Sequence, residues 1–286
     1  MKYGVSPAFL LSLFGEQFTP KDVVSAISLI RQLGFDCFQS EIVFADKITL
    51  WENGGAKAVS QTAEENELTM SQLVAHFMME AFKDRESLFS DEGVSEITRV
   101  FQIADMMRFQ GQVTIPMGPF RAIECLKEEE KQQCHVRLVE KMRVIMEIAC
   151  HFGNPVAIEV QPRALISGVS EILGFLEEVG SGLGYNYDTG HAWASGAVDT
   201  AQFPLVLTDR LMGTHLCDND GIVNLSLCPG EGTIDWATVM KNLVVSGYQG
   251  SIDLEIFTDA ERVKEKYSAG KAYLDGLLSS IMPRTY

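Results

Sequence analysis

The sequence predicts an α/β protein folded as a single-domain (β/α)8 TIM barrel that spans residues 1–286. Three observations support this prediction. Strand-like apolar segments alternate eight times with helical segments, the connections are short, and 286 residues is an ordinary length for one such barrel. An open, doubly wound sheet is the alternative. No Gly-x-Gly-x-x-Gly motif follows the first strand, so a dinucleotide-binding fold has no support.

The eight expected strands are short apolar runs that end at polar residues, glycine or proline. They cover 3–6, 35–39, 69–75, 113–115, 156–160, 183–187, 211–215 and 250–256. The first helix begins at Thr19, a good N-cap, with Pro20 in the first turn, and its apolar residues recur at helical spacing. The helices are expected over 20–33, 56–66, 90–109, 128–152, 170–179, 200–208, 235–245 and 259–278.

The composition is that of a soluble globular protein with an acidic surface. The chain has 39 acidic and 23 basic residues, a formal net charge of −16, and no basic stripe, which argues against a nucleic-acid partner. No apolar stretch reaches about 18 residues, so no membrane span is expected. The six cysteines are scattered without a Cys-x-x-Cys pair and no signal peptide precedes the first strand, which predicts reduced thiols and a cytoplasmic location.

Four of the expected strands end at a residue of a type that binds metals. These residues are Glu159, Asp188, His215 and Glu255. Taken singly, each has an ordinary alternative as a salt-bridge partner or a loop hydrogen-bonding group. Because a parallel barrel gathers the carboxyl ends of its strands at one face, we interpret the four together as the ligands of a single divalent metal ion.

An oxygen-rich site with one imidazole favours a hard or borderline cation. We expect Mn²⁺ first, with Mg²⁺, Co²⁺ and Zn²⁺ as alternatives. Such an ion could bind the carbonyl and neighbouring hydroxyl of a sugar, acidify the α-proton and stabilise a cis-enediolate. Glu159 and Glu255 would then be the catalytic acid/base pair on the two faces of the substrate.

Two segments carry a resemblance to a known family. Asp188-Thr189-Gly190-His191 is similar to its DTGH signature, and the segment from His215 to Trp236 resembles its H-x-x-D-x-D-G…P-G-x-G-x-I-D-W pattern. The family is the xylose isomerase-like TIM barrels, which comprises sugar phosphate isomerases and epimerases with an AP endonuclease family 2 branch. The resemblance covers nearly the whole chain. It implies the same four metal ligands and the same proton-transfer pair, with His191 contacting substrate, and its members are often homo-oligomers, as dimers or tetramers.

Differences between this sequence and the family's motifs narrow the range of expected functions. The endonuclease branch carries three zinc ions and needs an extra histidine after the fourth strand and an Asp-x-His in a later loop. This chain has neither, which argues against DNA repair. Ketose 3-epimerases usually continue the fifth strand as Glu-x-x-Asn-Arg-x-Glu. Here Arg163 keeps its place as a substrate contact, but Pro162 and Leu165 replace the Asn and the second Glu, so the substrate stays open.

Other strand ends offer further contacts to substrate. His76 ends the third strand, and its alternative role is a hydrogen bond to nearby backbone. Glu41 follows the second strand, as a polar contact. Trp193, with Phe44 and Phe77, could form an apolar wall of a sugar site.

The sequence therefore predicts a metal-dependent isomerase or epimerase of a small sugar or polyol ketone. A lyase that uses the same proton abstraction, such as a dehydratase or a keto-glycoside or C-glycoside deglycosidase, is the alternative. A non-catalytic sugar-binding subunit is a third reading, and the presence of all four ligand types argues against it.

Overall fold

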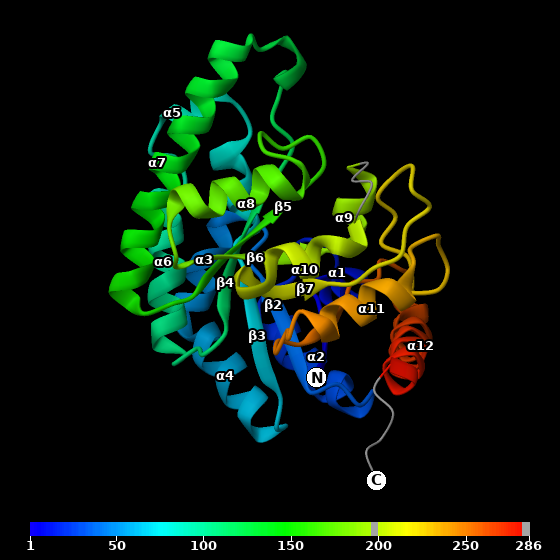
Figure 1. Cartoon of the computed structure of the whole chain (residues 1–286). Helices are drawn as coiled ribbons and strands as arrows, with labels where there is room; N and C mark the ends of the chain where they lie inside the picture. The colour runs from blue at the N-terminus through cyan, green and yellow to red at the C-terminus, as the bar shows by residue number, and fades with distance from the viewer. Residues whose placement is uncertain (196–199, 282–286) are drawn as a thin grey trace.

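The computed structural model describes residues 1–195 and 200–281, in which eight parallel strands form a barrel (Figure 1). The strands are β1 (Tyr3–Val5), β2 (Cys37–Glu41), β3 (Thr69–Val74), β4 (Gln112–Met117), β5 (Val156–Val160), β6 (Leu183–Asp188), β7 (Leu211–His215) and β8 (Ile252–Leu254). Each pairs with its neighbours in sequence, and β1 pairs with β8. Backbone hydrogen bonds close the remaining gap: Leu216 donates to Asp253 O at 2.8 Å, and Glu255 donates to Leu216 O at 3.0 Å.

Helices cover the outside of the barrel (Figure 1). The main ones are α2 (Pro20–Gln32), α4 (Ala56–Glu65), α6 (Val94–Met106), α7 (Glu128–Phe152), α8 (Gly168–Val179), α10 (Phe203–Leu207), α11 (Trp236–Val245) and α12 (Val263–Ile281). Apolar side chains of these helices pack on the strands in one buried core. In α2, Val23, Ile27 and Ile30 are fully buried at helical spacing. Thr19 is the N-cap, as predicted, and it forms a capping box with Asp22, which was not predicted.

Several short elements lie between the strands and the main helices. They are α1 (Ala8–Phe14), the 3-10 segments η1 (Ala45–Lys47) and η3 (His76–Phe82), α3 (Ile48–Leu50), the π-helical η2 (Trp51–Gly55), α5 (Arg85–Phe89) and α9 (Thr189–Ala194). The sequence did not predict α1, α5 or α9, because each is too short to show a helical period. All of them follow strands on the side of the barrel where the strands end.

Some predicted boundaries are wrong. Strand β2 runs to Glu41 rather than ending at position 39. The helix expected from position 90 begins after Gly93, whose φ of 84° suits glycine, while Asp84 caps the separate helix α5. The helix expected over 200–208 divides into a 3-10 turn, the short α10 and a second turn, with Pro204 in the first turn of α10. The long helix over 128–152 is confirmed.

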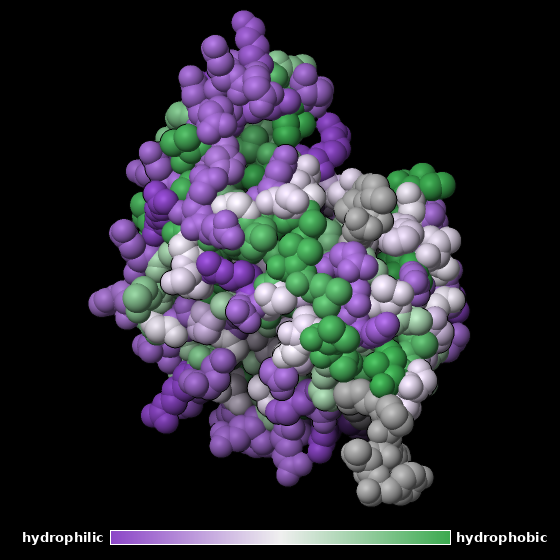
Figure 2. All heavy atoms as spheres, in the orientation of Figure 1, coloured by the Kyte–Doolittle hydropathy of each residue, from purple (hydrophilic) through white to green (hydrophobic). Residues whose placement is uncertain are grey.

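The surface carries separate hydrophilic and hydrophobic regions. Figure 2 shows hydrophilic residues over the outer end of α7, which begins with three glutamates. Hydrophobic residues gather over the middle of the same face, where Figure 1 places α10. Among the described residues, no helix is long and apolar enough to cross a membrane. All six cysteines are free, and four of them are buried.

Candidate active site

The four predicted metal-ligand residues meet at one end of the barrel. Glu159 lies in β5, Asp188 ends β6, His215 ends β7 and Glu255 follows β8. His215 Nδ1 lies 2.8 Å from Glu159 Oε2, 3.0 Å from Glu255 Oε2 and 4.0 Å from Asp188 Oδ2. All four side chains are buried. The parallel strands thus bring together residues that span nearly 100 positions of the chain.

His191 joins this cluster from α9. The Asp188 carboxylate caps that helix by accepting a hydrogen bond from the His191 backbone N–H at 2.8 Å. The cap turns the imidazole inward, so its Nδ1 lies 3.2 Å from Glu159 Oε1 and 3.3 Å from Asp188 Oδ2. Asp188 therefore both shapes the helix with one oxygen and offers the other oxygen to the site.

The donor atoms of the cluster fit a divalent cation. His191 Nδ1, His215 Nδ1 and Asp188 Oδ2 are buried and have no hydrogen-bond partner, although carboxylate oxygens lie close by. Buried polar atoms in this state cost free energy unless another group satisfies them. Two groups have ligand atoms within 4.8 Å of one another: Glu159 with Asp188 and His191, and Asp188 with Cys217 and Glu255. His191 and Cys217 are candidates that the sequence did not indicate as ligands.

The cluster is electrostatically coupled. Burial by itself lowers the pKa of His215, but Glu159 and Glu255 raise it to about 10. Burial also lowers the pKa of His191, yet Asp188 and Glu159 raise it to about 9. Burial acts to raise the pKa of Glu159, but the two histidines hold it well below its usual range. Burial raises the pKa of Glu255 to about 8, against the effect of His215. Imidazolium protons thus supply the positive charge that a metal ion would replace.

Side chains inside the barrel hold the Glu159 carboxylate in place. Asn186 Nδ2 donates to Glu159 Oε2 at 2.8 Å, and Gln72 Nε2 donates to Asn186 Oδ1 at 2.8 Å. Thr114 Oγ1 donates to Gln72 Oε1 at 2.5 Å. A Cβ on Gly213 would lie 2.4 Å from Gln72 Nε2, so a side chain here would displace the Gln72 amide from these hydrogen bonds. The sequence did not predict this chain of hydrogen bonds.

The site opens into a narrow cavity of about 110 Å³, the barrel mouth. Its walls include three predicted substrate contacts, Glu41, His76 and His191, together with the Glu159, His215 and Glu255 side chains. His76 Nδ1 lies 2.7 Å from Glu41 Oε1. Burial lowers the pKa of His76, but the Glu41 carboxylate outweighs it and the net shift is upward. Gln161, Asn224 and Phe257 also line the mouth and were not predicted.

Two predicted substrate contacts lie apart from this cavity. The Arg163 side chain is 68 % exposed, and its guanidinium lies 3.6 Å from Glu124. Trp193 stands beside Gly221, where a Cβ would lie 2.7 Å from the indole Nε1. Neither residue lines the mouth. Their contact with substrate stays a prediction.

The later motif residues form the loop after β7 rather than the metal cluster. Asp218 is fully buried and accepts hydrogen bonds from Gly230 N at 2.8 Å, Ile234 N at 3.1 Å and Trp236 Nε1 at 2.8 Å. The carboxylate thus ties the Pro-Gly-x-Gly-x-Ile-Asp-Trp segment to the end of β7. Asn219, next to it, donates to Gly190 O at 3.1 Å and so joins the loop to α9.

Comparison with known proteins agrees with this fold. Residues 27–277 match the family model described as xylose isomerase-like TIM barrel. An uncharacterised protein of Methanocaldococcus jannaschii is 32 % identical over 129 residues, which is 43 % of each chain. This chain's match therefore spans less than half the length of that curated relative.

Several solved structures are similar over nearly the whole chain. A D-psicose 3-epimerase has a TM-score of 0.78 at 16 % identity and covers 97 % of this chain and 99 % of its own. The IolI protein with a bound zinc atom has a TM-score of 0.77 at 16 % identity, with 99 % and 100 % covered. The 3-keto-D-glucoside 4-epimerase of E. coli has a TM-score of 0.74 at 20 % identity, with 96 % and 99 % covered. At these identities the likeness establishes the fold.

Proposed function

The chain belongs to the xylose isomerase-like TIM barrel family, and we propose that it is a divalent-metal-dependent epimerase or isomerase of a ketose or related polyol ketone. The single observation that carries the proposal is the buried cluster of Glu159, Asp188, His215 and Glu255, in which His215 Nδ1 and Asp188 Oδ2 lack a hydrogen-bond partner. The sugar epimerases among the structural relatives support the same class of reaction.

Glu159, Asp188, His215 and Glu255 would hold the ion, with His191 beside them. The donor set is mostly carboxylate with imidazole, which favours Mn²⁺, with Mg²⁺, Co²⁺ and Zn²⁺ as alternatives. When bound there, the ion would polarise a substrate carbonyl and stabilise negative charge on its oxygen.

The chain's own residues then carry the proton. Glu159 and Glu255 come from strands separated by β6 and β7, so they approach the mouth from different sides. One carboxylate removes the proton on the carbon next to the carbonyl, and the other returns a proton to the opposite face, which inverts that carbon. His191, 3.2 Å from Glu159 Oε1, orients that carboxylate.

Proton exchange with solvent tests this proposal. Mn²⁺-loaded protein is incubated with D-fructose, D-psicose, D-tagatose and a polyol ketone in D₂O, and products are followed by NMR and mass spectrometry. We expect deuterium at the carbon next to the carbonyl of at least one compound. Glu159→Gln and Glu255→Gln should abolish the exchange, whereas Glu67→Gln, which removes a surface carboxylate paired with Arg31, should leave it unchanged. Absence of exchange across the panel would contradict the proposal.

The same experiment separates an epimerase from the alternative lyase. Both reactions begin with abstraction of the same α-proton. An epimerase returns a sugar of unchanged mass apart from deuterium, whereas a lyase releases water or a leaving group. Mass spectrometry of the products therefore decides between the two.

A further inference from the structure

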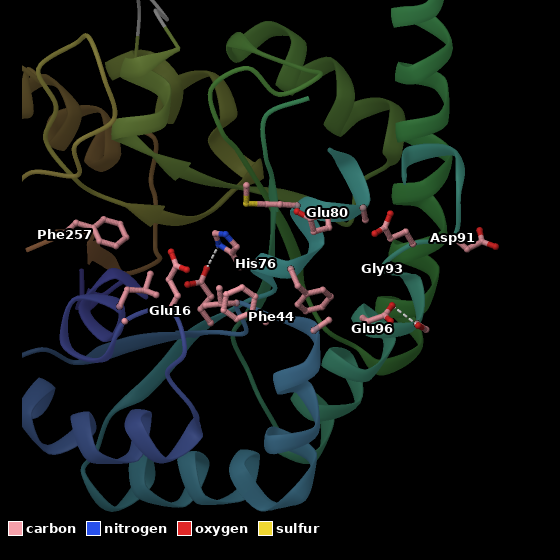
Figure 3. Close-up of a pocket in the computed structure, with 18 residues that line it drawn as sticks. Glu16, Phe44, His76, Glu80, Asp91, Gly93, Glu96 and Phe257 are labelled. Atoms are coloured by element: carbon pink, nitrogen blue, oxygen red, sulfur yellow. Dashed lines mark hydrogen bonds and ion pairs between the residues drawn. The ribbon is translucent and has the colours of Figure 1, made fainter. Parts of the chain in front are cut away.

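A second, much larger cavity adjoins the barrel mouth (Figure 3). We call it the annex; its volume is about 1010 Å³. Leu11, Glu41, His76 and Phe257 line both the annex and the mouth, so the two spaces lie side by side. In Figure 3 the annex extends from Phe257 and His76 toward Gly93 and Glu96, at the beginning of α6.

The sizes of the two spaces indicate that a ligand occupies both. Small-molecule sites commonly measure about 300–1,000 Å³. The mouth, at about 110 Å³, falls well below this range, and the annex lies at its upper end. A substrate whose reacting carbon lies beside Glu159 and His215 therefore has room for a large substituent in the direction of the annex.

The lining of the annex combines apolar side chains with carboxylates. The apolar side chains are Leu11, Val43, Phe44, Phe77, Met79 and Phe257. The carboxylates are Glu16, Glu41, Glu80, Asp91, Glu92 and Glu96, and Lys83 pairs with Glu80 from outside the lining. Among the described residues, neither cavity is lined by a lysine or an arginine. Such walls accept hydroxyl protons and pack on the flat faces of rings, but they repel phosphate and carboxylate groups.

Glu41 lies at the junction of the mouth and the annex, and one oxygen of its carboxylate has no hydrogen-bond partner. Its Oε1 lies 2.7 Å from His76 Nδ1, and its Oε2 is buried without a hydrogen-bond partner. The residue is only 6 % exposed. A buried carboxylate oxygen without a donor is costly. A sugar hydroxyl that crosses from the mouth to the annex is the donor this position lacks.

We propose that the substrate is an uncharged glycoside with a ketone on its reacting ring, which occupies the mouth, and that its second ring, a sugar or an aromatic group, occupies the annex. The placement of the reacting sugar rests on the function proposed above. Glu41 and His76 bind hydroxyls at the junction, and Phe44, Phe77 and Phe257 pack against the second ring. Phosphorylated sugars are excluded by the carboxylates.

Calorimetric binding to the Mn²⁺-loaded protein tests the proposal with a matched series of ligands. The ligands are methyl β-D-glucopyranoside, 4-nitrophenyl β-D-glucopyranoside, cellobiose and glucose 6-phosphate. At least one two-ring compound should bind about tenfold or more tightly than the methyl glucoside, which corresponds to burial of one ring. A preference for the nitrophenyl compound indicates an aromatic second ring, and a preference for cellobiose indicates a sugar. Equal affinities, or tighter binding of the phosphate, would overturn the proposal.

Variants that fill the annex provide a second test of the proposal. Ala45→Trp places a large side chain on η1 in the annex wall, and Ser95→Trp does the same from α6. Both should lower the affinity for the preferred two-ring compound about tenfold and leave the affinities for methyl glucoside and Mn²⁺ unchanged. Asp46→Trp, on the neighbouring exposed position outside the lining, is the matched control and should change none of them.

The two proposals fail in different ways. If metal-dependent deuterium exchange into ketoses occurs but a second ring adds no affinity, the glycoside proposal is wrong and the epimerase proposal stands. If two-ring ligands bind in the annex but no compound exchanges its α-proton, the site recognises glycosides without the proposed chemistry.

Discussion

Gln39 Oε1 lies 2.7 Å from His215 Nε2, while Nδ1 of the same imidazole faces Glu159 and Glu255. A carbonyl oxygen only accepts hydrogen bonds, so it keeps a proton on Nε2. Loss of one proton from the imidazolium therefore frees the Nδ1 lone pair toward the carboxylates. Gln39 is thus a positioning residue for the predicted ligand.

We predict that Gln39→Leu weakens Mn²⁺ binding about 10- to 100-fold, because the imidazole loses the group that fixes its orientation. Calorimetric titration measures the affinity. Asn242→Leu is the control: Asn242 also has a buried amide, but it lies on α11 and donates to Ala201 O at 2.8 Å rather than to the hydrogen bonds around Gln72. Equal losses in both variants would show a general effect on the barrel.

The stability of the metal-free protein should fall as the pH rises from about 6.5 to about 10. His215 and His191 have pKa values raised to about 10 and about 9. The folded protein therefore keeps protons that the unfolded chain releases near the ordinary histidine pKa of 6.5. Glu255, raised to about 8 from 4.5, acts in the same direction at lower pH. The lowered pKa of Glu159 affects stability only as the pH falls below about 4.5.

Thermal unfolding of EDTA-treated protein across this pH range measures the effect. The difference between wild type and His215→Gln isolates the histidine from the remaining titrating groups. Wild type should lose more stability than the variant over the interval, and parallel curves would contradict the assignment.

Asp218→Asn should lower the free energy of unfolding by about 2–4 kcal/mol, because the new amide group faces N–H donors in a buried site. Urea denaturation measures the change. Asp220→Asn is the control on the same loop: Asp220 is exposed and accepts from Ile222 N and Val223 N, so the loss should be much smaller. Similar losses would contradict the role of Asp218 as the anchor of the loop.

Lys141 is buried although its contacts are carbonyl oxygens. Its Nζ donates to Ala81 O at 3.1 Å and to Ser87 O at 3.0 Å, which ties η3 and α5 to α7. We expect Lys141→Met to lower the free energy of unfolding by about 2–3 kcal/mol, because two buried carbonyls lose their donor. Lys131→Met, on the exposed part of α7, should change stability little, and a neutral Lys141→Met would contradict this role.

The barrel and the meeting of the four proposed ligand residues could be predicted because each depends on a local pattern. Asp188 and His215 end apolar strands, and parallel topology brings such ends together. The supporting residues could not be predicted in this way. Asn186 reaches Glu159 only through the register of neighbouring strands, and Gln72 reaches Asn186 across the barrel. Helix α9 depends on the Asp188 cap rather than on a period.

The annex could not be predicted from the sequence for a different reason. It forms between the segments that follow β1, β2 and β3 and the beginning of α6, and the bounds of these segments were the least accurate predictions. Arg163 was predicted as a substrate contact from a motif, but the structure does not place it at the mouth. It occupies the place of a motif residue, yet in this fold its side chain lies on the surface beside Glu124.

Metal content of the purified protein is the most direct test of the central claim. Mass spectrometry should find about one equivalent of a divalent metal in wild type after incubation with Mn²⁺, Mg²⁺, Co²⁺ or Zn²⁺, and much less in Glu159→Gln and His215→Ala, because each variant removes one ligand. Glu67→Gln should retain the wild-type amount. A wild-type protein without metal, or variants that bind as much metal as wild type, would contradict the proposed centre.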